Sequence, residues 1–238
     1  MKKLSLLFTK DGLQWHISKG KTVLEEAFHF VTEETSPHLV EEKLDDVLKF
    51  DDDKEIEVIS ALNHFSLTPD SFTEHELGYK LISYNAPVDE ANEELMLSVN
   101  KKFAVQFYYT FPKHFYQKIK AKKLPTKFNF SGEKFLNALT VKNHKEIHIN
   151  LYHHQVEFFA FENKKVVLYN NLDADSEVDF LYFIMFSLSK INFGTAETHF
   201  HIYGETHENE TFISELRKFV KNIKVHFDNA PKKNFVLS

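Results

Sequence analysis

Two distant segments of this sequence have the same pattern of alternating apolar residues on either side of a short polar turn. The first, KLSLLFTKDGLQWHISK, spans residues 3–19, and the second, EIHINLYHHQVEFFAFENK, spans residues 146–164. Apolar residues that alternate with a period of two are typical of strands, and two such runs around a short turn predict a β-hairpin. The chain is therefore predicted to contain two similar hairpins, which restricts its fold more than any other feature.

The predicted turns determine which residues lie opposite each other in each hairpin. Asp-Gly is a favoured pair for a two-residue turn, and a turn at Asp11-Gly12 places Phe8 opposite Trp15. A turn at His153-His154 places Leu151 opposite Val156. Both registers give the hairpin one apolar face. The predicted faces consist of Leu4, Leu6, Phe8, Leu13, Trp15 and Ile17 in the first hairpin, and of Ile147, Ile149, Leu151, Val156, Phe158 and Ala160 in the second.

The segments that follow the two hairpins are also similar. Each half of the chain is predicted to contain a three-stranded meander, a helix, a strand and a helix. The elements expected after the first hairpin are a strand at 22–31, a helix at 37–49, a strand at 55–62 and a helix that begins near Thr68. Those expected after the second are a strand at 165–170, a helix that begins at Ser176, a strand at 198–203 and a helix from Phe212 to Ile223.

Residues 103–139, between the two halves, are predicted to form a strand, a helix, a short strand and a second helix. A repeat of this length predicts two lobes of the same topology, which we place at residues 1–125 and 126–238. The fold class predicted from these patterns is α/β, with mixed sheets in two duplicated lobes.

The composition excludes several classes of function. The chain has no cysteine, which excludes disulfides, iron–sulfur clusters, thiolate zinc sites and cysteine nucleophiles. The net charge of -6 provides no long-range attraction for nucleic acid. The longest apolar run, at 180–193, is interrupted by Lys190 and is shorter than the roughly 18 residues that a membrane span requires. We therefore predict a cytoplasmic protein without a membrane span.

The order of the predicted elements resembles that of the actin, sugar-kinase and Hsp70 superfamily, whose two lobes are ribonuclease H-like. The segment from Phe111-Pro112-Lys113 through Pro125 to the second hairpin resembles the approach to the second phosphate loop in actin-type proteins such as PilM and FtsA. Over nearly its full length, the chain is similar to a bacterial family without an assigned activity, domain of unknown function 3822. This similarity rests on Leu4-Ser5, Asp11-Gly12-Leu13, Asn63–Phe72, Leu168–Asn171, Asp179–Tyr182 and Ile202–Glu205.

The resemblance implies a cleft between the lobes in which the turns bind nucleotide phosphates through backbone N–H groups, and this requires small residues. An active member has Asp-x-Gly in both turns, whereas this chain has Lys10-Asp11-Gly12 in the first and no glycine around His153-His154 in the second. The loop that admits adenosine retains only Gly204, which Glu205 follows. The candidate cleft residues are Asp11, Gly12, His153, His154, Gly204 and Glu205. We predict a non-catalytic interaction or assembly module without a cofactor, which acts through a protein partner or self-association.

Three alternatives stay open. A divergent nucleotide-binding protein or ATPase would use Asp11, Gly12 and Gly204 with ATP and Mg²⁺. A metal ion could bind if His153 and His154 face Asp11 across the cleft, or at His199 and His201, which lie on one face of a predicted strand; we nevertheless predict no metal site. An RNA-associated protein would use a basic patch at the end of the middle helix, although we predict no nucleic-acid partner. That patch consists of Lys113, Lys118, Lys120, Lys122 and Lys123.

Overall fold

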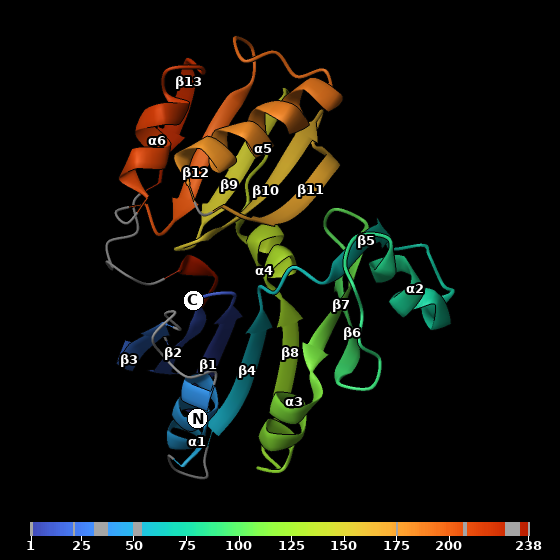
Figure 1. Ribbon diagram of the computed structural model, residues 1–238, viewed down its shortest axis with the longest axis vertical. Helices are drawn as coiled ribbons and strands as arrows, with labels where there is room; N and C mark the ends of the chain where they lie inside the picture. Colours follow the sequence, from blue (N-terminus) through green and yellow to red (C-terminus); the bar gives the residue numbers. More distant parts are fainter. Residues whose placement is uncertain are drawn as a thin grey trace. The chain divides into compact units, whose positions relative to one another are not determined.

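The computed structural model describes residues 2–20, 22–30, 38–49, 54–174, 176–206, 209–226 and 234–237. The chain divides into two compact units. The first comprises the residues up to Asn137 together with Leu237, and the second runs from Ala138 to Val236. Each unit contains a five-stranded sheet, and the first unit has an additional three-stranded sheet (Figure 1). The compact units divide later than the predicted lobes, because the strand at Thr126–Phe130 pairs within the first unit.

The two five-stranded sheets have the same strand order and the same strand directions. The first has the order β3-β2-β1-β4-β8 and the second has the order β11-β10-β9-β12-β13. In each, the meander is antiparallel and the last two strands run parallel to the first strand of the meander. The strands of the first sheet are β1 (Lys2–Thr9), β2 (Gly12–Lys19), β3 (Thr22–Phe30), β4 (Lys54–Ser60) and β8 (Thr126–Phe130). Those of the second are β9 (Glu146–Leu151), β10 (Gln155–Glu162), β11 (Lys165–Asp173), β12 (His199–Gly204) and β13 (Asn222–Val225).

The register of the first hairpin differs from the prediction by two residues. Phe8 lies opposite Leu13 rather than Trp15, and Gly12 already pairs with Thr9 as the first residue of β2. The connecting residues are therefore Lys10 and Asp11, and the backbone N–H of Asp11 donates to Thr9 Oγ1 over 3.2 Å. Because a shift of two residues leaves each side chain on its original face, the predicted apolar face is confirmed and is buried in full.

The second hairpin has the predicted register. Leu151 lies opposite Val156, and Ile149 lies opposite Phe158. The two-residue connection is His153-His154, and the N–H of Tyr152 donates to the carbonyl of Gln155 over 2.9 Å. All six residues of the predicted apolar face are buried.

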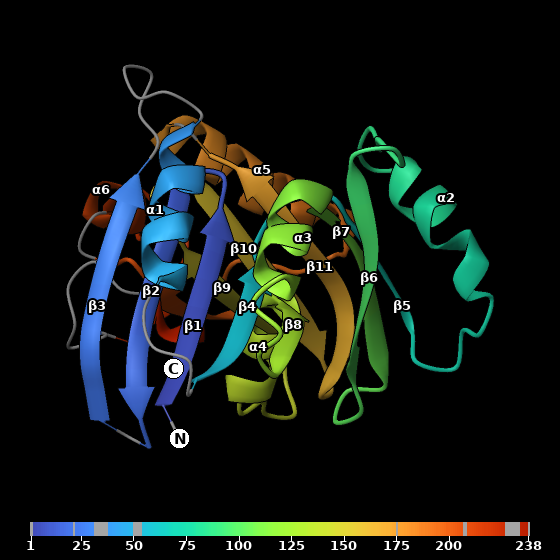
Figure 2. The ribbon, with the colours of Figure 1, turned by 90° about the horizontal axis from the view of Figure 1, so that it is seen from below.

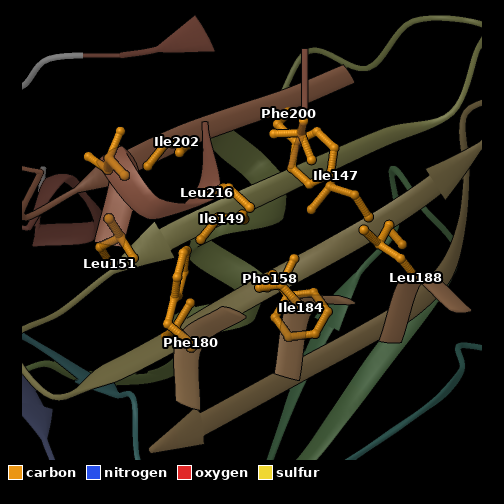
Figure 3. Close-up of a cluster of buried hydrophobic side chains, with 14 of the residues drawn as sticks. Ile147, Ile149, Leu151, Phe158, Phe180, Ile184, Leu188, Phe200, Ile202 and Leu216 are labelled. Carbon is orange, nitrogen blue, oxygen red and sulfur yellow. The ribbon is translucent and has the colours of Figure 1, made fainter. Parts of the chain in front are cut away.

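The core of the second unit lies between this apolar face and two helices, α5 (Glu177–Lys190) and α6 (Glu210–Leu216) (Figure 3). The helix α5 begins where predicted, because the side chain of Ser176 accepts a hydrogen bond from the Asp179 N–H as an N-cap. Phe180 of α5 stacks on Phe212 of α6 at 5.0 Å between ring centroids. Each fully buried side chain of this size stabilises the fold by about 1.5–3 kcal/mol relative to an exposed one.

The first unit has an equivalent core. The apolar face of its first hairpin packs against α1 (His38–Leu48) and α3 (Lys113–Lys120), which lie on the same face of the sheet (Figure 2). Leu44 of α1 and Ile119 of α3 are completely buried there. The elements predicted around α3 are also present, since β8 follows it and leads into α4 (Ser131–Ala138).

Two helix predictions were wrong in part. Thr68 and Pro69 end a strand, β5 (Phe65–Pro69), which forms the third sheet with β6 (Glu93–Asn100) and β7 (Val105–Pro112). A proline is tolerated there because β5 is an edge strand, and the helical residues come later, in a 3₁₀ turn (His75–Leu77) and α2 (Gly78–Ser83). The last predicted helix ends at Leu216, and Ile223 lies in β13, where it pairs with Phe200 of β12. A second 3₁₀ turn spans Phe235–Leu237.

Among the helices of the described ranges, none is long and apolar enough to cross a membrane.

Candidate functional site

The turn of the first hairpin lies at the end of β1 in the first unit. Asp11 is buried, and its backbone N–H donates to Thr9 Oγ1, as described above. Gly12 has φ of 137°, a conformation that favours glycine, so the geometry of the hairpin requires the glycine of the Asp-Gly pair. The prediction that this turn faces His153 and His154 stays a prediction, because the two turns belong to different units.

The turn of the second hairpin is built differently. His153 is exposed and His154 is half-buried, and their rings lie edge to face at 4.0 Å between centroids. The carbonyl of His154 accepts from the N–H of Ala174 over 3.1 Å. No residue of this turn is a glycine, so each of its residues carries a side chain.

The loop after β12 is filled by side chains of the same unit. Gly204 has φ of 82°, and a Cβ placed on it would lie 3.0 Å from Asn234 Nδ2 and closer still to the Leu151 carbonyl oxygen. The Nδ2 group of Asn234 donates to Asn150 Oδ1 over 3.0 Å and to that carbonyl over 3.1 Å. Asn234 is completely buried. The space next to Gly204 is therefore occupied by side chains and backbone of the same unit.

Further hydrogen bonds tie this loop to the second hairpin. Glu205 is buried, and its N–H donates to the carbonyl of Leu151 over 2.9 Å. The side chain of Asn209 donates to the carbonyls of both Tyr152 and Glu205, over 2.8 and 2.7 Å. These carbonyls therefore have hydrogen-bond partners within the second unit, as buried polar groups generally do.

A buried carboxylate lies beside this loop. Glu157 of β10 accepts hydrogen bonds from Asn150 Nδ2 at 2.7 Å, from the Tyr152 hydroxyl at 2.6 Å and from the Tyr169 hydroxyl at 2.9 Å. Because Asn150 also accepts from Asn234, one hydrogen-bond network runs from Glu157 to the residues around Gly204. Such a satisfied network makes the buried polar face of this sheet rigid.

The five lysines of the predicted basic patch have different surroundings. Lys118 contacts Glu41 and Asp45 of α1 at 2.8 Å each, and these hydrogen-bonded carboxylates raise its pKa. Lys113 donates to the carbonyls of Glu90 and Ala91. The ammonium groups of these two lysines are thus engaged within the first unit. Lys120 lies over the rings of Tyr116 and Phe128, and Lys122 and Lys123 are exposed.

A cluster of titratable residues in the second unit was missed as a whole by the sequence analysis. Glu146 and His148 of β9 and His201 of β12 offer three ligand atoms that lie within 4.8 Å of one another. The Nε2 atom of His148 is 3.3 Å from Glu146 Oε2, and the Nε2 atom of His201 is 3.6 Å from Glu146 Oε1. The two imidazole rings are stacked at 4.6 Å between centroids and 8° between planes. Both β9 residues are completely buried.

Two further side chains fix the orientation of these imidazoles. The Nδ1 atom of His148 is 3.2 Å from the Tyr203 hydroxyl, and the Nδ1 atom of His201 is 3.1 Å from His226 Nε2. Each ring therefore uses Nδ1 for a protein partner and directs Nε2 towards the carboxylate of Glu146. Burial lowers the pKa of His201, and the neighbouring His148 lowers it further, to about 4.

Parallel pairing of β9 with β12 brings this cluster together. His201 lies directly opposite His148, and His199 lies opposite Glu146. The alternation of Glu146 and His148 with the apolar Ile147 and Ile149 was the signal that could have shown them on one face. Their proximity to His201 could not be deduced, since it depends on which strand becomes the neighbour of β9.

Comparisons with known proteins agree with this architecture. The family described as "Protein of unknown function (DUF3822)" matches residues 1–223. The chain belongs to this family. No curated protein matches it at a significant level.

Solved structures similar to this DUF3822 chain have an actin-like fold. A Bacteroides thetaiotaomicron protein with actin-like ATPase fold and unknown function has a TM-score of 0.79 at 19% identity, with 94% of this chain and 90% of that one covered. The PilM-PilN type IV pilus biogenesis complex matches with a TM-score of 0.61 at 10% identity, covering 94% and 88%. The cytoplasmic domain of EpsL, an inner membrane component of the type II secretion system of Vibrio cholerae, matches with a TM-score of 0.52 at 8% identity, with 98% of this chain and 88% of that one covered. The predicted family and fold are thereby confirmed.

Proposed function

We propose that this protein is a cytoplasmic, non-catalytic actin-like module that binds another protein chain through its surface. The observation that supports this most directly is an exposed apolar stripe on α5. It consists of Val178, Tyr182 and Phe186, which are 73%, 59% and 47% exposed. Residues spaced by four lie on one side of a helix, so the three form a continuous strip along its outer face.

The composition of α5 makes this stripe unusual. A helix that packs on a sheet normally has polar residues on its outer side, and the inner side of α5 already supplies Phe180, Ile184 and Leu188 to the core. Tyr182 and Phe186 stack on each other at 5.7 Å between ring centroids, which presents a flat aromatic surface. Aromatic side chains are enriched where protein surfaces meet. A binding role explains why apolar residues occupy both sides of this helix.

The loops around Gly204 support the non-catalytic part of the proposal. An actin-type nucleotide site needs open backbone at the phosphate turns and space beside the adenosine loop. In this chain, Asn234 fills that space and the turn at His153-His154 has no glycine. One of the similar structures is a complex of two pilus-biogenesis proteins, and a fold of this kind is therefore compatible with protein binding.

Site-specific photocrosslinking tests the binding surface. A photoreactive phenylalanine analogue in place of Tyr182 should crosslink to another protein chain in native cells, whereas the same analogue in place of Tyr84 should not. Tyr84 is a matched control because it is 74% exposed and belongs to the first unit, where it directly follows α2. Crosslinks that Phe186→Asp removes support the proposal, and their mass distinguishes self-assembly from a different partner. Equal crosslinking at both positions, or none at position 182, would refute it.

Calorimetry with ATP, ADP and Mg²⁺ tests the loss of nucleotide chemistry. We expect no saturable binding by the wild type. Micromolar binding that Asp11→Ala abolishes would instead establish the alternative, a divergent nucleotide-binding protein. Because this measurement does not involve α5, it can fail independently of the crosslinking experiment. RNA affinity that falls with salt and with neutralisation of Lys120 and Lys122 would favour the RNA-associated alternative.

A further inference from the structure

We infer that Glu146, His148 and His201 form a binding site for a divalent transition-metal ion, for which Zn²⁺ is the best match. The three residues lie within the second unit, on the face of the sheet opposite the apolar core. This inference is independent of the proposed function. It differs from the prediction made from the sequence, which was that the chain has no metal site.

The two nitrogen–oxygen distances fit a single ion, and all three ligand atoms lie within 4.8 Å of one another. Atoms bound at 2.0–2.1 Å to a tetrahedral ion lie about 3.4 Å from one another. The two imidazole Nε2 atoms lie 3.3 and 3.6 Å from the oxygens of Glu146. Two histidines and one carboxylate are a ligand set that zinc and similar ions accept, whereas Mg²⁺ and Ca²⁺ prefer oxygen ligands alone.

The outer contacts of the two imidazoles are those that a metal ligand requires. A metal-bound histidine usually donates its other ring N–H to a neighbouring acceptor, which fixes both the tautomer and the ring orientation. The Tyr203 hydroxyl and His226 Nε2 are acceptors of this kind for the Nδ1 atoms of His148 and His201. With both Nδ1 atoms protonated, the lone pairs of both Nε2 atoms point towards the carboxylate.

Hydrogen bonding accounts for only one oxygen of the carboxylate, since Glu146 Oε2 accepts from the Lys142 N–H over 2.9 Å and lies 3.3 Å from His148 Nε2. Charge-assisted hydrogen bonds are typically about 2.7–2.9 Å long, and both imidazole contacts to Glu146 are longer than this. Within the described part of the chain, the buried Oε1 atom of Glu146 accepts no hydrogen bond, although His144 Nε2 lies 3.0 Å away as an ion-pair partner if protonated. An oxygen so buried is costly to leave unsatisfied, and a bound cation would supply the missing partner.

The site has a route for an ion and a position for a fourth ligand. The side chain of His201 is 16% exposed, so its edge of the cluster is open to solvent. A water molecule can supply the fourth ligand of such an ion.

Metal titration of the untagged, chelator-treated full-length chain tests the inference. Zn²⁺ should bind with a stoichiometry of one per chain by calorimetry, and Co²⁺ should give the visible d–d absorption of a four- or five-coordinate ion. The variants Glu146→Gln and His201→Gln should each weaken binding by at least tenfold. The double variant His153→Gln/His154→Gln is the matched control, because it removes two adjacent histidines outside the site, and it should bind as the wild type does.

Binding that both sets of variants weaken equally would mean that zinc contacts surface histidines only, and the inference would be wrong. The absence of saturable binding by the wild type would also refute it. If Glu146→Gln and His201→Gln do not fold, ¹⁵N spectra of the imidazoles in the wild type replace them. Addition of one equivalent of Zn²⁺ should then shift the Nε2 resonances of His148 and His201, and unchanged resonances would overturn the assignment.

Discussion

The substitution Gly204→Ala should destabilise the second unit by about 2–5 kcal/mol. Two separate effects contribute. The backbone at Gly204 has φ of 82°, and an L-residue in a left-handed conformation costs about 1–2 kcal/mol. In addition, the new methyl group would approach Asn150 Oδ1 and the Leu151 carbonyl oxygen more closely than 3.0 Å. The carbonyl belongs to β9 and cannot rotate away, so relief of this overlap should cost a further 1–3 kcal/mol, roughly as overpacking does elsewhere.

Gly20→Ala separates the two effects. Gly20 also has a positive φ, of 61°, but a Cβ placed there would meet nothing within 4 Å. This control should therefore lose only the backbone contribution, of about 1–2 kcal/mol. Guanidinium denaturation of both variants, followed by far-UV circular dichroism, measures the losses. The fluorescence of Trp15, the only tryptophan, identifies the transition of the first unit. If Gly204→Ala were no more destabilising than Gly20→Ala, the close approach of Leu151 and Asn150 to Gly204 would be wrong.

Three further changes have defined outcomes. Burial raises the pKa of Glu57, but the ammonium groups of Lys3 and Lys134 outweigh this effect and hold the pKa below its ordinary value. The stabilisation that ionised Glu57 contributes is therefore present above about pH 4.5, and it is lost as the pH falls through the lower pKa of the folded state. Thermal unfolding across this range should depend less on pH in Glu57→Gln, and an equal pH dependence would contradict the assignment. Ser176→Ala removes the N-cap of α5 and should cost about 1 kcal/mol in denaturation experiments, whereas Ser176→Thr, which keeps the hydroxyl that accepts from the Asp179 N–H and donates to its carboxylate, should retain most of the stability. Phe180→Ala should cost about 3–5 kcal/mol and Phe180→Leu clearly less, since the leucine fills part of the cavity; equal losses would argue against tight packing here.

Local sequence patterns predicted most of the fold because the two hairpins have short connections and strictly alternating apolar residues. The faces of both hairpins and the start of α5 at Ser176 depend on neighbouring residues only. The exact register of the first hairpin was not predicted. The connection is Lys10-Asp11, one residue earlier than the Asp-Gly pair indicates, and the Thr9 hydroxyl accepts from the Asp11 N–H there. The two helix errors have a common cause. Short strands such as β5 and β13 obtain their hydrogen bonds from a distant partner, which a local period does not identify.

The candidate site was predicted less well than the fold. The sequence identified Gly204 and Glu205 as residues of interest, but not that Asn234 closes the space beside them. It also drew attention to His201 through its neighbour His199, whereas Glu146 and His148 are the residues that lie beside His201. Fourteen histidines spread along the chain made any one pair uninformative.

The sequence by itself determined the duplicated meanders, their apolar faces and the absence of glycine from the second turn, because each of these features depends on residues that are close in the sequence. The tertiary structure alone decided which polar residues meet. Parallel pairing of β9 with β12 places His201 beside His148, and Asn234 approaches Gly204 from a later part of the chain. Both contacts join segments far apart in the sequence, where alternation fixes the face of a side chain but not its neighbour on the next strand.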